Sequence, residues 1–167
     1  SWNNGSGWVE PARIDGIEGL VGSFDICLAR DGSIYLSILT DIDSNISSPG
    51  DERISVMKWN GSAWDSLHTI SENISVVHGP VLTHGQGIPH HSPNHGTILI
   101  NWIQDNDGNL SDELNRSVVG TLLREEGWQA LRTYTSGAFS NMDVGLAGYI
   151  NNGGSSLFYP VFSLVSG

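Results

Sequence analysis

The sequence predicts an all-β protein built from four-stranded antiparallel meanders that recur about three times along the chain. Three observations lead to this fold class. Short apolar runs alternate with polar residues, as in half-buried strands, while helical periodicity is essentially absent. Gly, Asn, Asp and Ser bound these runs, as is typical of turns between strands. The same order of strands, turns and tryptophan then returns further along the chain.

The first copy is the clearest. We expect a strand at residues 24–29, a turn at Arg30-Asp31-Gly32 and a second strand at 33–40. An Asp-Gly pair between two apolar runs is a strong hairpin signal. After a polar loop, a third strand is predicted at 54–59, and a fourth opens at Trp64.

The later copies follow the same order. The second has expected strands at 78–82, 97–104, 117–123 and from Trp128 onward. The third has two, starting at 143–146 and at 157–165, on either side of an Asn-Asn-Gly-Gly turn. One further strand is expected at 8–14, which makes about eleven in all. The prediction is a single domain over residues 1–167, with repeat boundaries near 8–63, 64–127 and 128–167.

Tryptophan marks one point in each copy. Trp8, Trp64 and Trp128 each follow a turn that contains glycine. A large aromatic side chain that recurs at one position most simply packs between neighbouring sheets. The alternative is an aromatic platform that stacks against a sugar.

Four-stranded meanders repeated at about this length are typical of β-propeller blades. The turn-plus-tryptophan signature, together with the Asp-Gly hairpin, resembles the sialidase-like and lectin-like propellers over nearly the whole chain. The Asp-box of sialidases (Ser-x-Asp-x-Gly-x-x-Trp) is not matched, because the segment from Asn60 to Trp64 keeps only its glycine and tryptophan. The resemblance implies a propeller that either binds or hydrolyses glycans.

Three blades are too few to close a ring, since propellers have at least four. Residues 162–167 followed by residues 1–8 resemble the segment 54–64. A second copy of the chain would therefore complete the third blade and give a closed, six-bladed homodimer without open edges. The alternative is that the chain belongs to a longer propeller polypeptide.

The charge balance narrows the possible partners. Seven Lys and Arg residues stand against eighteen Asp and Glu residues, for a formal net charge of -11. Such a chain is a poor partner for nucleic acid or an anionic membrane and suits cations, neutral sugars or basic proteins better. No apolar run approaches the roughly 20 residues of a membrane-spanning helix, so no membrane span is expected.

Localisation is predicted from the ends and from potential glycosylation sites. The chain begins at Ser1 without a charged and then apolar leader, so any signal peptide is expected to have been removed. Six Asn-x-Ser sequons begin at Asn4, Asn45, Asn60, Asn73, Asn109 and Asn115. They could carry glycans in a secretory pathway, although Asn and Ser are also ordinary turn residues. We expect an extracellular or secreted protein, with the periplasm as the alternative.

Three polar residues are the candidate ligand-binding site. Asp25, His78 and Asp143 are expected in one register at the start of the innermost strands. In a propeller these strands line the central channel, so the three side chains could meet a polar ligand or a cation there. The alternative is that each one hydrogen-bonds to the backbone of the neighbouring sheet.

Two acidic loops are candidate metal sites. The predicted ligands are Asp41, Asp43, Asn45 and Glu52 in the first loop, and Asp105, Asp107 and Asn109 in the second. Alternating carboxylate and amide oxygens can converge on Ca²⁺, the one cofactor that the sequence suggests. An EF-hand is rejected because Ile46 and Leu110 stand where that loop needs glycine. The alternative is a solvated acidic turn without an ion.

The predicted function is non-catalytic. We expect an extracellular binding propeller that recognises a glycan or a protein surface through the loops at one end. The alternative is a sialidase-like glycoside hydrolase, or half of one, with catalytic residues that converge at the propeller axis. Sialidase chemistry implies an arginine cluster, yet the arginines are scattered over strand ends and turns. Whether the chain is an enzyme stays open, and no catalytic residue is assigned. The single cysteine, Cys27, is expected to be a buried structural thiol.

Overall fold

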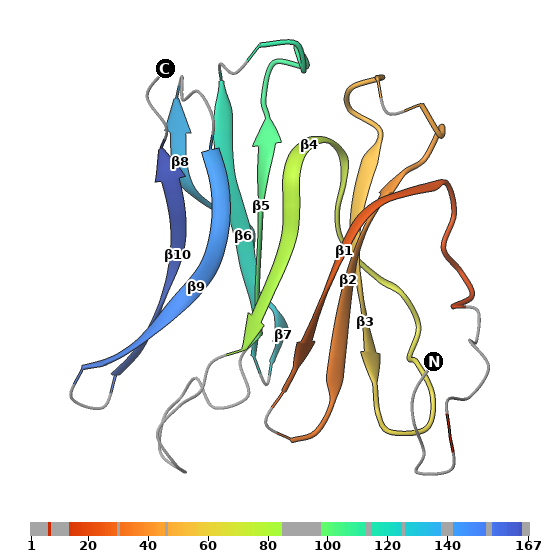
Figure 1. Ribbon diagram of the computed structural model, residues 1–167, viewed down its shortest axis with the longest axis vertical. Coiled ribbons are helices and arrows are strands. Elements are labelled where there is room, and N and C mark those ends of the chain that lie inside the picture. The colour runs from red at the N-terminus through yellow and green to blue at the C-terminus, as the bar shows by residue number, and fades with distance from the viewer. Residues whose placement is uncertain are drawn as a thin grey trace.

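The computed structural model describes residues 7, 14–29, 31–45, 47–84, 98–112, 115–124, 126–137, 142–152 and 155–164, with the backbone alone for 84 and 135–164. Over these ranges the protein is all-β and antiparallel, as predicted, and contains no helix (Figure 1). No helix of the length and apolarity needed to cross a membrane therefore occurs in the described part.

The strands follow the predicted order. They are β1 (Leu20–Leu28), β2 (Ile34–Asp41), β3 (Glu52–Trp59), β4 (His68–His84), β5 (Ile98–Asp105), β6 (Arg116–Arg124), β7 (Gly127–Trp128), β8 (Arg132–Gly137), β9 (Met142–Asn152) and β10 (Ser155–Leu164). The strand expected at 8–14 falls mostly outside the described residues, which leave out 8–13.

Strands β1 to β8 form one open antiparallel sheet that divides at β4 into two halves. The first part of β4 pairs with β3, up to Ile74, and the second part pairs with β5 from Ser75 onward. In Figure 1, β4 rises beside β3, turns over at the top of the molecule and descends beside β5. The first half is therefore the meander β1-β2-β3-β4, and the second is the meander β4-β5-β6-β8.

The turn in β4 corrects one expectation. A strand opening at Trp64 and another at 78–82 were expected as separate elements, but residues 68–84 form the single strand β4. Asn73, which has a φ of 57°, takes the left-handed conformation where the chain reverses, and Asn tolerates this region better than most residues. Both flanks keep pairing with their neighbours, so no unpaired loop is left.

Alternation along β2 shows how the halves pack. Tyr35 and Leu39 face the second half and join one core with Ile54 and Val56, whereas Leu36 and Ile38 face the other way. The second half contributes to the shared core with Leu82, Ile98, Ile100, Trp102 and Val119. Trp102 has no exposed surface. The two halves therefore pack face to face.

Of the three tryptophans predicted to pack between neighbouring sheets, Trp128 does so and Trp64 does not. Trp128 of β7 packs against the shared core and stacks on His68 of β4, with ring centroids 6.3 Å apart. Trp64 lies against the opposite face of the first half, near Leu36 and Met57, and its ring is 5.5 Å from that of Trp59. Trp8 lies outside the described residues.

The first strands of the successive units lie side by side. β1 contacts β4, and β4 in turn contacts β9, so β4 lies between the other two in Figure 1. β9 and β10 form a separate antiparallel hairpin, at the place where the third copy was predicted to begin.

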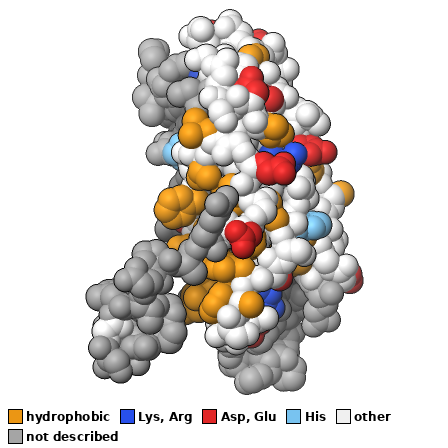
Figure 2. Space-filling model, turned by 90° about the vertical axis from the view of Figure 1, so that its right-hand side faces the viewer, with side chains coloured by type: hydrophobic (Ala, Val, Ile, Leu, Met, Phe, Trp, Pro, Cys, Tyr) orange, Lys and Arg blue, Asp and Glu red, His pale blue; other side chains and the backbone are white. Residues whose placement is uncertain are grey.

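One face of the first half carries exposed apolar side chains. Phe24, Ile26 and Leu28 of β1 are all more than half exposed, and they pair with Ile38, Leu36 and Ile34 of β2. We call Phe24, Ile26, Leu28, Leu36 and Ile38 the outer face. Figure 2 shows hydrophobic side chains gathered on this side of the molecule.

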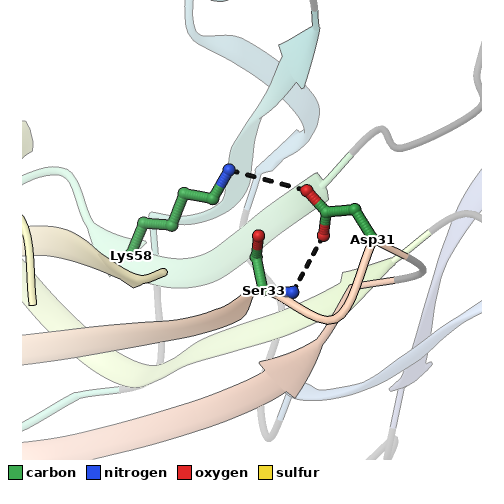
Figure 3. A network of polar contacts seen from close by, with 3 residues as sticks. All are labelled: Asp31, Ser33 and Lys58. Atoms are coloured by element: carbon green, nitrogen blue, oxygen red, sulfur yellow. Dashed lines mark hydrogen bonds and ion pairs between the residues drawn. The ribbon is translucent and has the colours of Figure 1, made fainter. Parts of the chain in front are cut away.

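The Asp-Gly signal correctly predicted the hairpin between β1 and β2. The Asp31 carboxylate accepts a hydrogen bond from the Ser33 N–H at 2.9 Å, which closes the turn, while Gly32 takes a φ of 84°. Lys58 reaches from β3 to the same carboxylate, with its Nζ 3.6 Å from Oδ2 (Figure 3). The hydrogen bond and the ion pair lower the pKa of Asp31.

Candidate functional site

One end of the molecule collects the predicted site residues. The β2–β3 and β5–β6 hairpins both point their acidic loops to the top of Figure 1, where β4 also turns over. Pro49 and Gly50 from the first loop and Asn106 and Gly108 from the second line a shared hollow of about 350 Å³. We call this end of the molecule the loop end.

Beside the loop end, two side chains of β1 hold β4. The Asp25 Oδ2 atom accepts a hydrogen bond from the Leu82 N–H at 2.7 Å, and Ser23 donates its hydroxyl to the Gly79 carbonyl. The other Asp25 oxygen accepts the Ile26 N–H at 2.9 Å. The alternative reading of Asp25, a hydrogen bond to the neighbouring sheet, is therefore confirmed.

A pocket of about 670 Å³ opens between β1 and β4 on this side. Its polar lining includes Ser23, Asp25 and His78, and its apolar lining includes Phe24 and Pro80. Phe24 is 69% exposed, so its ring is open to solvent. A concave, largely apolar surface with a few convergent polar groups is the usual form of a small-ligand site.

The pairing changes the predicted register of the site residues. Asp25 lies opposite Ser37 in the first half, whereas the equivalent position in the second half, opposite Asn101, belongs to Val81 rather than His78. The ladder shifts between His78 and Val81, where Pro80 has no N–H to donate. Asp25 and His78 nevertheless line the same pocket. Asp143 lies in β9 opposite Ser163, and its side chain is outside the described part.

The first acidic loop brings three carboxylates together. One oxygen from each of Asp41, Asp43 and Asp51 lies within 4.8 Å of the other two. The Asn45 N–H donates to Asp43 at 2.7 Å, and the Ser48 hydroxyl donates to Asp43 at 3.0 Å. Of the four predicted ligands in this loop, Asp41 and Asp43 belong to the cluster.

Glu52 and Asn45 occupy different places from those predicted. Asp51 stands in the cluster where Glu52 was expected, because Glu52 is the first residue of β3 and lies opposite Asp41 in the ladder. The Asn45 amide oxygen accepts the Ser47 N–H. The sequence carried a signal for Asp51, since it directly precedes Glu52.

The pKa values of the acids in this loop are shifted in opposite directions, upward by burial and repulsion and downward by hydrogen bonding. Burial, with Asp51 and Asp41 close by, raises the pKa of Glu52. Burial and the neighbouring Asp43 and Asp41 raise the pKa of Asp51. The hydrogen bond from the Asn45 N–H lowers the pKa of Asp43 instead. The loop therefore holds some carboxylates in a surrounding that disfavours their charge.

The second acidic loop has a similar cluster with more internal donors. One oxygen from each of Asp105, Asp107 and Asp112 lies within 4.8 Å of the other two. The Asn109 amide donates to Asp112, and the Asn115 amide donates to Asp107. Hydrogen bonds from the Asn109 N–H and the Asn115 amide lower the pKa of Asp107. Predicted ligands Asp105 and Asp107 are thus in the cluster, with Asn109 bonded to its third member.

No family model, curated protein or solved structure matches this chain.

Proposed function

We propose that the chain is part of a β-propeller, with each half of the sheet as one blade and the β9–β10 hairpin as the start of a third. The face-to-face packing of two equivalent meanders supports this arrangement. So does the order of neighbours, because β1, β4 and β9 are the first strands of successive units and lie side by side. Radial sheets around an axis bring their first strands together in this way.

The function that we propose is non-catalytic recognition of a glycan at the pocket between β1 and β4. The observation that carries it is the composition of that pocket, which is lined by the exposed aromatic residue Phe24 together with Ser23, Asp25 and His78. A sugar presents apolar C–H faces and hydroxyl groups, so it requires an aromatic surface beside hydrogen-bonding side chains. The pocket of about 670 Å³ has room for a small oligosaccharide.

The hydrogen bonds of the pocket's carboxylate favour binding over hydrolysis. Glycoside hydrolases normally use two carboxyl groups on either side of the scissile bond. Among the described residues that line this pocket, Asp25 is the only carboxylate, and both its oxygens accept backbone N–H groups. It is therefore committed to holding β1 against β4.

We propose an extracellular setting, and a ring completed either by a second copy of the chain or by further blades. The outer face supports the need for a partner. Phe24, Ile26 and Leu28 of this face are apolar and more than half exposed. On the second half, the first half covers the equivalent face and packs on Ile100 and Trp102. A basic or neutral partner would suit the net charge of -11.

A glycan array probed with the whole chain tests the proposed function, followed by calorimetric titration of the glycans that bind. Phe24→Ala should weaken binding by about tenfold, since loss of an aromatic contact costs on the order of 1 kcal/mol. Leu28→Ala is the matched control, because Leu28 is exposed on the same face of β1 but does not line the pocket. Equal losses in both variants, or no glycan bound, would contradict the proposal. Release of a chromogenic aglycone would favour the hydrolase.

A further inference from the structure

The two acidic loops look alike in sequence, but the structure distinguishes them. Asp41 and Glu52 form the last rung of the β2–β3 ladder, and Asp105 and Arg116 form the same rung of the β5–β6 ladder. The residues just before the third strands, Asp51 and Asn115, are equivalent as well. Two acids of the first loop are thus replaced in the second by an amide and a guanidinium.

Buried oxygens without partners mark the first loop. Asp41 is 3% exposed and Glu52 is 6% exposed. Asp41 Oδ2, Asp51 Oδ1 and Glu52 Oε2 are buried and have no hydrogen-bond partner. Burying a carboxylate oxygen without a partner is unfavourable, so three such oxygens in one loop indicate that a positive charge is missing.

The described residues of this loop do not provide that charge. No Lys or Arg occurs from Asp41 to Glu52. The next residue, Arg53, follows Glu52 in β3, so its side chain points to the opposite face of the strand. Its Nε atom is 3.6 Å from Glu72.

The second loop contains its own positive charge and hydrogen-bond donors beside its carboxylates. Arg116 is buried beside Asp105 in the ladder and donates to the Asp112 carbonyl at 2.8 Å. The amides of Asn109 and Asn115 donate to Asp112 and Asp107. Asp105 Oδ2 is the one carboxylate oxygen of the described second-loop residues left buried without a partner.

We propose that the first loop binds one Ca²⁺ through Asp41, Asp43 and Asp51, and that Arg116 takes the place of the ion in the second loop. Three carboxylates with oxygens within 4.8 Å of one another can share a single ion. Ca²⁺ takes six to eight oxygens in flexible geometry, so water and the Ser48 hydroxyl would complete the shell. Mg²⁺ requires a stricter octahedron and gives up water reluctantly. This proposal does not depend on the glycan site.

Calorimetric titration of CaCl₂ into the chelator-treated chain tests the proposal, with thermal unfolding as a second readout. We expect about one Ca²⁺ per chain, a melting temperature that rises with Ca²⁺ and saturates, and a weaker response to MgCl₂. Asp43→Asn should weaken Ca²⁺ binding by at least about tenfold. Asp43 is exposed, so this variant should still fold.

The matched control is Asp107→Asn, the equivalent change in the second loop. It should leave Ca²⁺ affinity within about threefold of the unchanged chain. The double change Asp51→Asn with Glu52→Arg copies the second loop into the first. It should abolish the Ca²⁺ response while keeping the fold. Two equal sites, equal losses in Asp43→Asn and Asp107→Asn, or no heat and no thermal shift at 10 mM CaCl₂ would overturn the proposal.

Discussion

The Asp25 carboxylate joins the first strands of two successive units by accepting the Leu82 N–H, 57 residues further along the chain. This N–H lies at the edge where β4 meets β1, and the ladder with β5 occupies the other edge of β4. The carboxylate therefore satisfies a backbone donor that another strand would pair in a continuous sheet.

Replacing Asp25 should loosen the contact between the two halves. Asp25→Ala removes a charged acceptor and leaves the Leu82 N–H unpaired, which should lower the free energy of unfolding by about 1.5–3 kcal/mol. Urea denaturation measures the change. Glu18→Gln, at an exposed loop position, should have little effect. A loss in Asp25→Ala no larger than in this control would show that the bond contributes nothing.

The Cys27 thiol should be unreactive in the folded protein. Burial, with Asp25 nearby, raises the pKa of Cys27 to about 11 from an ordinary 9.0. At pH 8 the thiolate fraction falls by about 100-fold, so alkylation by iodoacetamide should slow by a similar factor relative to the chain in urea. Cys27 is the one cysteine in the sequence, so the signal is unambiguous. Comparable rates in the folded and denatured chain would contradict the prediction.

The turn at Asp31 should make stability depend on acid pH. Because the folded pKa of Asp31 is lowered, its contribution is present above the unfolded pKa and is lost as the pH falls through the folded value. Asp31→Asn should therefore destabilise the protein at pH 7, by less than about 1 kcal/mol because the pair is exposed. The difference from the unchanged chain should shrink as the pH falls from 7 to below the ordinary aspartate pKa of 3.8. Denaturation across this range measures it, and a difference that stays constant with pH would refute the assignment.

Local signals predicted the strands well, and long-range geometry accounts for the differences. The Asp31-Gly32 turn and the alternation in β2 depend on neighbouring residues, so they can be read directly from the sequence. The reversal at Asn73 keeps strand pairing on both sides because β3 and β5 are available as partners. Nothing in residues 71–78 alone distinguishes this bend from a loop.

The positions of the site residues also depend on long-range geometry that the local sequence does not show. His78 and Asp25 line the same pocket, but the shift at Gly79 and Pro80 moves His78 out of the predicted register. The acidic loops were recognised by composition, whereas the contrast between Glu52 and Arg116 emerges only from the rungs that they share with Asp41 and Asp105. His90, His91 and His95 lie outside the described residues.

The outer face should mediate self-association if a second copy completes the ring. Ile26 is 56% exposed there, beside Leu36, whose equivalent Ile100 is buried between the halves. Light scattering should show a mass that rises with concentration toward twice the chain mass of 18.0 kDa. Ile26→Asp should hold the mass at one chain, because a charge on an apolar interface opposes its burial. Leu131→Asp, at an exposed apolar position of the second half, should leave association unchanged. A mass of one chain at every concentration, or equal effects of both variants, would instead favour a ring completed by other blades.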